Sequence, residues 1–272
     1  MQSVFDELYE NSLAKCEFKN LISIITAEEN IRLAYRNLKK NAGSRTPGTD
    51  GKTIADLAKM SEPELIGFVQ QKFNWYQPQS VRRKEIPKGN GKTRPLGIPT
   101  IMDRLIQQCV LQVMEPICEA KFCETSNGFR PNRGVENALA QAEKHMQKSN
   151  LHIVIDIDIK GFFDNVNHGK LLRQIWTMGI HDKKLLSIIS AMLKAEVAGI
   201  GFPEKGTPQG GILSPLLSNI VLNELDWWIT SQWVGMPTRH EYSGKIHENG
   251  TKDQSKKYRE LRKTNLKECY IV

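Results

Sequence analysis

The stretch Leu151-His-Ile-Val-Ile-Asp-Ile-Asp-Ile-Lys-Gly-Phe-Phe-Asp164 alternates apolar and polar side chains near the middle of the 272-residue chain. All of its odd positions up to residue 159 are apolar, and its even positions include Asp156, Asp158 and Lys160. This period of two, rich in β-branched residues, predicts a strand over residues 151–159 with one face in the core. The other face then carries two carboxylates in line, their Cβ atoms about 6.5–7 Å apart at the rise of a strand.

Two interpretations of these paired carboxylates are open. Neighbouring acids on an exposed strand face repel each other unless a positive charge lies between them. One interpretation is therefore a divalent metal site held by strand carboxylates, as in phosphoryl transfer. The other is a solvated strand edge that binds nothing. The stretch by itself does not choose between them.

The composition is that of an ordinary globular chain with an excess of positive charge. Hydrophobic residues make up 39% and charged residues 25%, and the formal net charge is +8. No apolar run has the length of a membrane span, and the N-terminus lacks the layout of a signal peptide. The five cysteines form no CxxC pair, which favours reduced thiols in a cytoplasmic protein. The charge favours a polyanionic partner, either nucleic acid or phospholipid.

The first part of the chain is predicted to be mainly helical. Thr26–Glu29 and Ser61–Glu64 each have the spacing of a capping box that opens a helix. Between them, residues 44–51 are dense in turn residues and predict a loop.

Residues 81–99 predict a basic hairpin. Asn90-Gly91 lies between two extended segments, which is a strong signal for a two-residue turn. Against the single acid Glu85 stand six basic residues: Arg82, Arg83, Lys84, Lys88, Lys92 and Arg94. Such a finger could contact phosphates, Arg94 as a bidentate fork and Lys88 as a point charge. The alternative is a solvated edge hairpin whose lysines block aggregation.

Two glycine-containing turns follow. The turn Asn127–Gly134 carries Arg130 and Arg133, which either hold a nucleic-acid backbone or cap neighbouring carbonyls. It leads into a helix whose apolar side, over residues 135–146, is expected to face inward. Gly206-Thr-Pro-Gln-Gly-Gly211 is a loop whose backbone is free to approach a ligand closely. Such a loop can also be a simple connection that binds nothing.

The order of these motifs resembles the reverse transcriptases encoded by bacterial group II introns, also called maturases because they help their intron RNA to splice. The motifs are the basic hairpin, Gly-Phe-Arg-Pro-Asn-Arg133, Asp158-Ile-Lys-Gly-Phe-Phe-Asp-Asn-Val-Asn-His168 and Gly206-Thr-Pro-Gln-Gly-Gly-Ile-Leu-Ser-Pro-Leu-Leu-Ser-Asn219. The similarity runs from about residue 28 to residue 272.

The resemblance implies an α+β fold, the fingers and palm of a right-hand polymerase, with an antiparallel palm sheet packed on helices. Residues 1–80 would be a helical N-terminal extension and the start of the fingers. Residues 81–150 would be fingers with the basic hairpin. Residues 151–272 would be an incomplete palm, with a basic insertion at about 238–265.

The resemblance also assigns site residues one by one. Asp158 matches the first catalytic aspartate, a ligand of two Mg²⁺ ions, and the backbone carbonyl of Ile159 is a further ligand. Phe163 matches the aromatic residue that excludes the 2′-hydroxyl of an incoming nucleotide, whereas Asp156 matches no catalytic role. The other matched nucleotide-binding residues are Lys88, Arg94, Gly161, Phe162, Gln209 and Gly210. The basic residues expected to contact RNA are Arg82, Arg83, Lys84, Arg130, Arg133, Lys256, Lys257, Arg259, Arg262 and Lys263.

The implied function is RNA-directed DNA polymerisation by two-metal phosphoryl transfer, together with a maturase role in intron splicing and mobility. The implied partners are intron RNA, an RNA template with a DNA primer, and dNTPs, in the bacterial cytoplasm and without a membrane; a homodimer is left open. The family's Tyr-Ala-Asp-Asp turn occurs nowhere, and Glu268–Val272 resembles the strand before it. We therefore expect an N-terminal fragment that binds RNA without catalysis.

Two alternatives to this function are open. The first is an RNA-binding splicing module without polymerase activity. The second is a retron, diversity-generating or CRISPR-associated reverse transcriptase.

Overall fold

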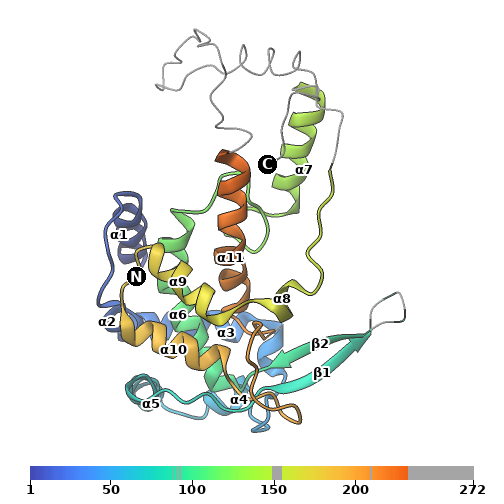
Figure 1. Ribbon diagram of the computed structural model, residues 1–272. Helices are drawn as coiled ribbons and strands as arrows, with labels where there is room; N and C mark the ends of the chain where they lie inside the picture. The colour runs from blue at the N-terminus through green and yellow to red at the C-terminus, as the bar shows by residue number, and fades with distance from the viewer. Residues whose placement is uncertain (88, 90, 92, 149–154, 209, 232–272) are drawn as a thin grey trace. The chain divides into compact units, whose positions relative to one another are not determined.

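The computed structural model describes residues 1–87, 89, 91, 93–148, 155–208 and 210–231 (Figure 1). The chain divides into two compact units, Met1–Asp226 and Trp227–Val272, and almost all of the described structure belongs to the first. The described helices are α1 (Gln2–Leu13), α2 (Leu21–Ile25), α3 (Glu28–Lys40), the 3₁₀ helix η1 (Ala42–Arg45), α4 (Ile54–Leu57), α5 (Glu62–Asn74), α6 (Ile101–Glu119), α7 (Val135–Glu143), the π-helix η2 (Lys144–Lys148), α8 (Phe162–Asn165), α9 (His168–Thr177), α10 (Lys183–Leu193) and α11 (Ser214–Ile229).

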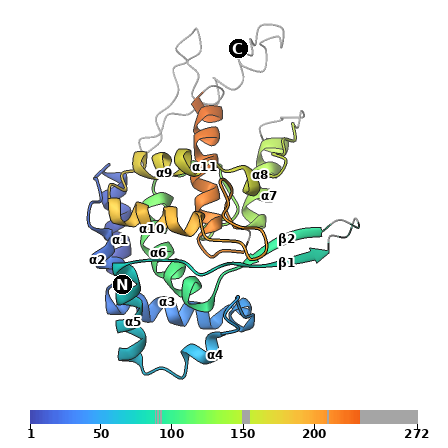
Figure 2. The same cartoon turned by 60° about the horizontal axis from the view of Figure 1, so that its bottom comes forward.

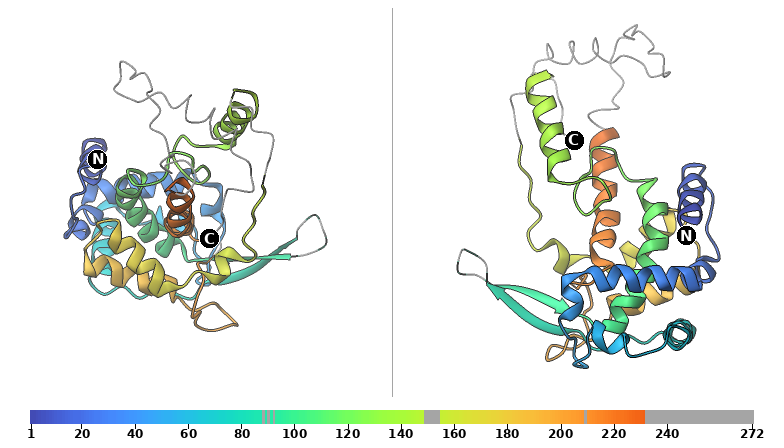
Figure 3. Two further views of the ribbon diagram at one scale, coloured as in Figure 1. Left: turned by 45° about the horizontal axis from the view of Figure 1, so that its top comes forward. Right: turned by 180° about the vertical axis from the view of Figure 1, so that it is seen from behind.

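Helix α6 lies at the centre of the first unit and packs against α1, α2 and α3 (Figure 3). Apolar residues occupy nearly every side of it, and a helix of that kind is stable only when buried all round. Its fully buried side chains include Ile101, Leu105, Val110, Val113 and Ile117. The N-terminus of α6 is capped by Thr100, whose Oγ1 accepts a hydrogen bond from the Asp103 amide at 3.2 Å.

Buried polar side chains join α6 to the segments around it. Gln112 donates to the Asn30 side chain of α3 at 2.8 Å, and Asn30 in turn donates to the Cys109 carbonyl at 3.1 Å. Arg104 donates to the Gly43 and Thr46 carbonyls at 2.7 and 2.6 Å, which ties the η1 turn to α6. These hydrogen bonds compensate the cost of burying the polar groups and fix how α3 and η1 lie on α6.

The predicted hairpin is confirmed. Strands β1 (Arg82–Pro87) and β2 (Thr93–Ile98) are antiparallel, with Arg82 opposite Ile98 and Ile86 opposite Arg94. The hairpin extends away from the helices (Figure 2). The capping box at the start of α5 is also confirmed, since the Glu64 carboxylate accepts from the Ser61 amide at 2.8 Å. Among the described cysteines, Cys109, Cys118 and Cys123 are buried, whereas Cys16 is exposed.

The capping box predicted at Thr26 is wrong. Helix α3 begins at Glu28 with Ala27 as its N-cap, and Thr26 instead ends α2. The Thr26 hydroxyl donates to the Ile22 carbonyl at 2.8 Å, one turn earlier. A threonine side chain can satisfy a helix end on either side of it, and here the short preceding helix uses it.

The strand predicted at 151–159 is wrong for its described part, residues 155–159, which form no ladder. Ile155, Ile157 and Ile159 are 79%, 72% and 45% exposed. A strand needs a hydrogen-bonded neighbour to be stable, and no described strand lies beside this stretch. Within the described residues the only sheet is the hairpin, so the antiparallel palm sheet expected in 151–272 is not found among them. Residues 151–154 lie outside the described part.

The inward apolar face predicted for residues 135–146 is also wrong. Helix α7 has no buried residue, and Val135 and Leu139 are 71% and 64% exposed. No described element covers this side of the helix. The fold class nevertheless holds, because helices and an antiparallel sheet make the chain an α+β protein. Among the described helices, none combines the length and the apolar character needed to cross a lipid bilayer.

Candidate active site

Three segments far apart in the sequence meet at the short helix α8. They are α8 itself with the stretch before it, the loop 206–211, and the base of β2 around Gly97. A cavity of about 190 Å³ opens between them and is lined by residues of all three, including Asp164, Thr207 and Leu96. The site is therefore built by backbone contacts between segments, and glycines make those contacts possible.

The first contact joins the loop to α8. The Gly206 amide donates to the Val166 carbonyl and the Thr207 amide donates to the Phe163 carbonyl, both at 2.7 Å. Gly206 has φ +93°, and a Cβ there would lie 3.0 Å from the Phe163 carbonyl oxygen. Both the backbone conformation and the space therefore require glycine. The buried His168 ring donates from Nε2 to the Gly206 carbonyl at 2.7 Å and fixes the position of the loop.

The second contact joins the loop to the hairpin. Gly210 has φ +115°, and a Cβ on it would overlap the Gly97 carbonyl oxygen of β2. The loop is held on its other side by α6, because the Ile212 amide donates to the Gln107 side chain at 2.8 Å. The predicted nucleotide-binding residue Gly210 thus lies directly against the base of the basic hairpin. Gln209 lies outside the described residues.

The turn before α8 is formed by Gly161, which has φ +61°. Asn165 donates from its side chain to the Gly161 carbonyl at 2.9 Å and closes this turn. Lys205, from the loop side, donates to the Asn165 side chain at 2.9 Å. The turn presents the chain between Asp158 and Phe163 at the surface of the first unit.

Phe162 and Phe163 have different surroundings. Their rings meet edge to face, with centroids 5.6 Å apart. Phe162 packs against the hydrophobic core, whereas Phe163 is half-buried and does not belong to the described core. The backbone of Phe163 is anchored to Thr207 while its ring stays partly accessible. This arrangement suits a ring that contacts a ligand.

Asp158 and Ile159 precede the turn and are exposed. Within the described part of the chain, the Asp158 carboxylate makes no hydrogen bond or ion pair. Mg²⁺ prefers oxygen ligands and is usually held by one or two carboxylates together with water and substrate phosphates. The Asp158 carboxylate and the Ile159 carbonyl fit part of such a set. No group of three acidic, histidine or cysteine side chains able to hold a metal occurs among the described residues.

Some of the basic side chains of the hairpin have partners within the protein and others are exposed. The guanidinium of Arg83 pairs with the Glu85 carboxylate at 2.7 Å, and this hydrogen bond lowers the pKa of Glu85. Arg82 is half-buried, and its Nε has no partner among the described residues. Lys84 and Arg94 are exposed. Lys88 and Lys92 lie outside the described residues.

Arg130 has a structural role. Its side chain is 2% exposed and pairs with the Glu119 carboxylate of α6 at 2.6 Å. The same guanidinium donates to the Cys123 and Ser126 carbonyls at 2.8 and 2.7 Å. The second of the two alternatives drawn from the sequence, carbonyl capping, therefore applies to Arg130, and its guanidinium is not presented to RNA.

Arg133 caps a carbonyl in the same turn, and part of its side chain stays exposed to solvent. It donates to the Glu124 carbonyl and is half-exposed. The other predicted RNA contacts, Lys256, Lys257, Arg259, Arg262 and Lys263, lie outside the described residues.

Sequence reasoning missed the residues that hold the loop in place. Gln107, His168 and Lys205 make these contacts across 105, 38 and 40 positions of the chain. Local periodicity carries no information on such distant partners. His168 and Asn165 lie within the motif that follows Asp158, which was the only signal available for them.

Comparison with known proteins gives one family match. Residues 86–248, more than half of the chain, match the family described as reverse transcriptase (RNA-dependent DNA polymerase).

Curated relatives extend this match. Protein YkfC of Escherichia coli is 35% identical over 231 residues, which is 82% of this chain and 60% of that protein. The group II intron-encoded protein LtrA of Lactococcus lactis is 38% identical over 240 residues, which is 84% of this chain and 38% of that protein. The nuclear intron maturase 4 of Arabidopsis thaliana is 26% identical over 236 residues, 84% of this chain and 27% of that protein. The chain thus spans less than two thirds of the length of these relatives.

Among solved structures, the chain is similar to part of a chain of a Cas6-RT-Cas1--Cas2 complex, with a TM-score of 0.48 and 22% identity. That likeness covers 78% of this chain and 22% of the other. At this TM-score it adds nothing to the sequence relationships.

Proposed function

Because the chain belongs to the reverse transcriptase (RNA-dependent DNA polymerase) family, we propose that it forms the fingers and part of the palm of a group II intron reverse transcriptase that also acts as a maturase. The resemblance drawn from the motifs is confirmed by relatives that include LtrA. The observation that carries the proposal is the backbone junction in which Thr207 donates to Phe163 at 2.7 Å. This junction places the glycine loop beside the segment that follows Asp158.

The residues of the junction take the following roles in the proposal. The Asp158 carboxylate and the Ile159 carbonyl hold Mg²⁺, which supplies charge stabilisation during phosphoryl transfer. The backbone amides of Gly161 and Phe162 face the triphosphate of the incoming nucleotide. The ring of Phe163 occupies the space that a 2′-hydroxyl would need.

The loop and the hairpin bind the same nucleotide from the other side. Gln209 and Gly210 contact the nascent base pair, and Lys88 and Arg94 clamp the phosphates from the fingers. Gly210 lies against the base of β2, so the loop and the hairpin are in direct contact. The partners are an RNA template with a DNA primer, dNTPs and intron RNA, which a bacterial protein meets in the cytoplasm.

A second candidate function concerns residues 1–272 alone. The sequence contains no Tyr-Ala-Asp-Asp, which leaves Asp158 as the only matched catalytic carboxylate. A two-metal site needs several carboxylate oxygens. We therefore propose that these residues by themselves bind RNA but do not extend a primer.

Primer extension tests the polymerase proposal. A longer protein that carries these residues together with a Tyr-Ala-Asp-Asp turn, the family's second source of carboxylates, should extend a DNA primer on an RNA template. Asp158→Asn should abolish extension and leave RNA affinity unchanged, because the change removes a metal ligand and not a basic side chain. Asp156→Asn is the matched control, two residues away on the same stretch, and should remain active. Extension by Asp158→Asn at the control's rate would refute the catalytic role.

Salt dependence tests RNA binding by the 272-residue chain. The logarithm of the association constant should fall with the logarithm of salt concentration, with a slope of roughly −0.7 to −0.9 for each phosphate contact. Replacing Arg82, Arg83 and Lys84 together with alanine should flatten that slope if the hairpin contacts phosphates. A slope near zero for the unmodified chain would contradict an electrostatic interface.

A further inference from the structure

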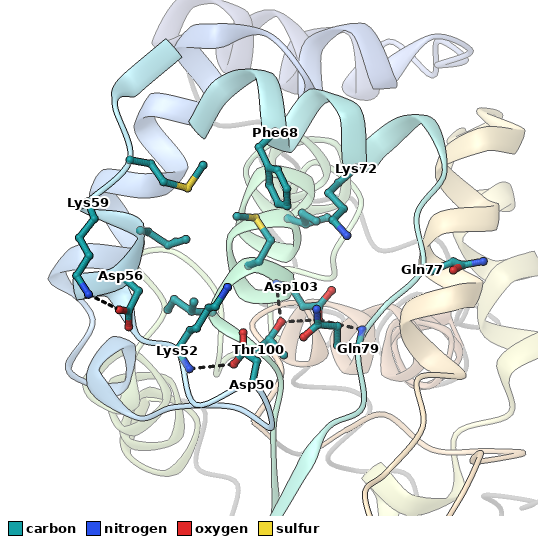
Figure 4. A pocket seen from close by; sticks show the side chains of 15 residues that line it. Asp50, Lys52, Asp56, Lys59, Phe68, Lys72, Gln77, Gln79, Thr100 and Asp103 are labelled. Atoms are coloured by element: carbon teal, nitrogen blue, oxygen red, sulfur yellow. Dashed lines mark hydrogen bonds and ion pairs between the residues drawn. The ribbon is translucent and has the colours of Figure 1, made fainter. Parts of the chain in front are cut away.

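A second cavity, of about 400 Å³, opens where α4, α5 and the start of α6 meet (Figure 4). We refer to it as the α5 pocket. None of its lining residues lines the smaller cavity beside the glycine loop. Its volume lies within the range of about 300–1,000 Å³ that is usual for ligand sites. The functions proposed above make no use of it.

The floor of the α5 pocket is apolar and one of its walls is an exposed ring. Leu57, Ile101 and Ile106 are buried beneath it, with Met60 and Met102 partly buried. Phe68 of α5 is 39% exposed and points toward the start of α6 (Figure 4). An accessible aromatic ring beside methionines on an apolar floor provides a platform on which a planar group can stack.

The acidic side chains of the pocket are already engaged within the protein. The buried Asp103 carboxylate accepts from the Thr100 hydroxyl at 2.6 Å and from the Tyr76 hydroxyl at 2.8 Å. Asp56 pairs with Lys59 at 2.8 Å. These acids therefore offer little attraction to an incoming cation.

Asp50 accepts a hydrogen bond from the Lys52 amide at 3.1 Å, which orients its carboxylate and leaves the negative charge in place. All three acids that line the pocket thus have partners.

The remaining polar groups are cationic or amidic. The ammonium groups of Lys52 and Lys72 form no ion pair among the described residues, and Lys72 Nζ lies 5.4 Å from the centroid of the Phe68 ring. The side-chain amides of Gln77 and Gln79 make no hydrogen bond within the described part of the chain. A partly exposed ring, two lysines without an ion pair among the described residues and the Gln79 amide match a planar base carrying phosphate.

We propose that the α5 pocket binds an unpaired nucleotide of an RNA strand, with the base stacked on Phe68 and the phosphates held by Lys52 and Lys72. The proposal rests on the RNA-binding function proposed above. It also links the pocket to the candidate active site, because Ile106 lines the pocket while the next residue, Gln107, holds the glycine loop at Ile212. An RNA strand in the pocket would thus be held by the same helix as the loop.

RNA affinity measured by fluorescence anisotropy tests this assignment in the 272-residue chain. Phe68→Ala should weaken binding of a short single-stranded RNA about tenfold, the effect of losing one stacked base. The matched control is Tyr9→Ala on α1, whose ring is 36% exposed and lies outside the pocket. Phe68→Trp should restore the affinity, because a larger ring still stacks. Binding of the fully paired duplex should not change in any of these variants.

The charge contribution has its own pair of variants. Lys72→Gln should reduce single-strand affinity more than Lys183→Gln, which removes one charge from the exposed side of α10. RNA carrying 5-iodouridine at an unpaired position should crosslink to peptides of the pocket. Free AMP should not displace the bound RNA.

Equal affinities for Phe68→Ala and Tyr9→Ala, crosslinks outside the pocket, or occupancy by AMP instead of RNA would overturn the assignment. If the unmodified chain binds RNA while Phe68→Ala is unaffected, the pocket assignment alone is wrong. If the unmodified chain binds no RNA, the proposed RNA-binding function is wrong as well.

Discussion

Helix α6 and the stretch 155–159 are both rich in branched apolar residues, yet their surroundings are opposite. Ile117 of α6 is 0% exposed, whereas Ile157 is 72% exposed. Helix α6 satisfies its backbone internally and is covered by α1, α2 and α3. The stretch 155–159 would need a neighbouring strand to do the same. Apolar character therefore buries a segment only where other elements supply the missing surface and hydrogen bonds.

Arg130 fastens the turn before α7 to Glu119 at the end of α6, the buried member of the comparison. Arg130→Ala should lower the free energy of unfolding by about 3–5 kcal/mol, because the Glu119 carboxylate then loses its buried partner. Urea denaturation measures this loss. Arg133→Ala, in the same turn but half-exposed, is the control and should cost far less. If Arg130→Ala lowered the free energy of unfolding only slightly and weakened RNA binding, Arg130 would be an RNA contact and not a structural residue.

The same substitution in each region tests the comparison itself. Ile117→Ala should cost about 2–5 kcal/mol of unfolding free energy, through lost burial and the cavity left behind. Ile157→Ala should change it by no more than about 0.5 kcal/mol, as for other exposed positions. Equal losses in thermal or urea unfolding would show that residues 155–159 are packed in solution.

Two glycines sharpen the account of the candidate site. Gly206→Ala should destabilise the chain by about 1–3 kcal/mol, because alanine is strained at this φ and crowds the Phe163 carbonyl. Gly67→Ala, inside α5 with nothing within 4 Å of the added Cβ, should instead stabilise it by about 0.5–1 kcal/mol. Differential scanning calorimetry of both variants compares them directly. A neutral Gly206→Ala would mean that the loop does not lie against α8.

The smallest expected effect is the pH dependence of the stability that Asp56 contributes. The ion pair with Lys59 and the amide hydrogen bond from Thr53 lower the pKa of Asp56 to about 2. A lowered pKa contributes stability above the unfolded value of 3.8, and this contribution is lost as pH falls toward about 2. The difference in Tm between the unmodified chain and Asp56→Asn should therefore be present at neutral pH and vanish as the pH falls to about 2. A difference independent of pH would exclude an electrostatic origin.

Local signals in the sequence were enough for much of the fold. The spacing of Ser61 and Glu64 predicted the start of α5, and Asn90-Gly91 predicted the hairpin, because both depend on near neighbours. Thr26 was misassigned because its hydroxyl can cap a helix on either side. The stretch 151–159 was misassigned over its described part because a period of two indicates a strand only where a partner strand exists.

The resemblance nominates the parts of the candidate site, and these assignments stay predictions, whereas the contacts that assemble the parts come from the structure alone. The motif order placed Asp158, Phe163 and Gly210 in one site. The junction of Thr207 with Phe163 depends on a contact across about forty residues, which no periodicity reveals. The sequence does not distinguish the two roles of Arg130 for the same reason, since its partner Glu119 belongs to another element.

Nucleotide selection tests directly whether the junction of α8 and the glycine loop is a reverse transcriptase site. In a longer protein that extends primers, Phe163→Val should raise incorporation of GTP relative to dGTP at least about tenfold, because the smaller side chain leaves room for the 2′-hydroxyl. Steady-state extension on an RNA template measures this ratio. An unchanged ratio in a folded, active Phe163→Val protein would contradict the account.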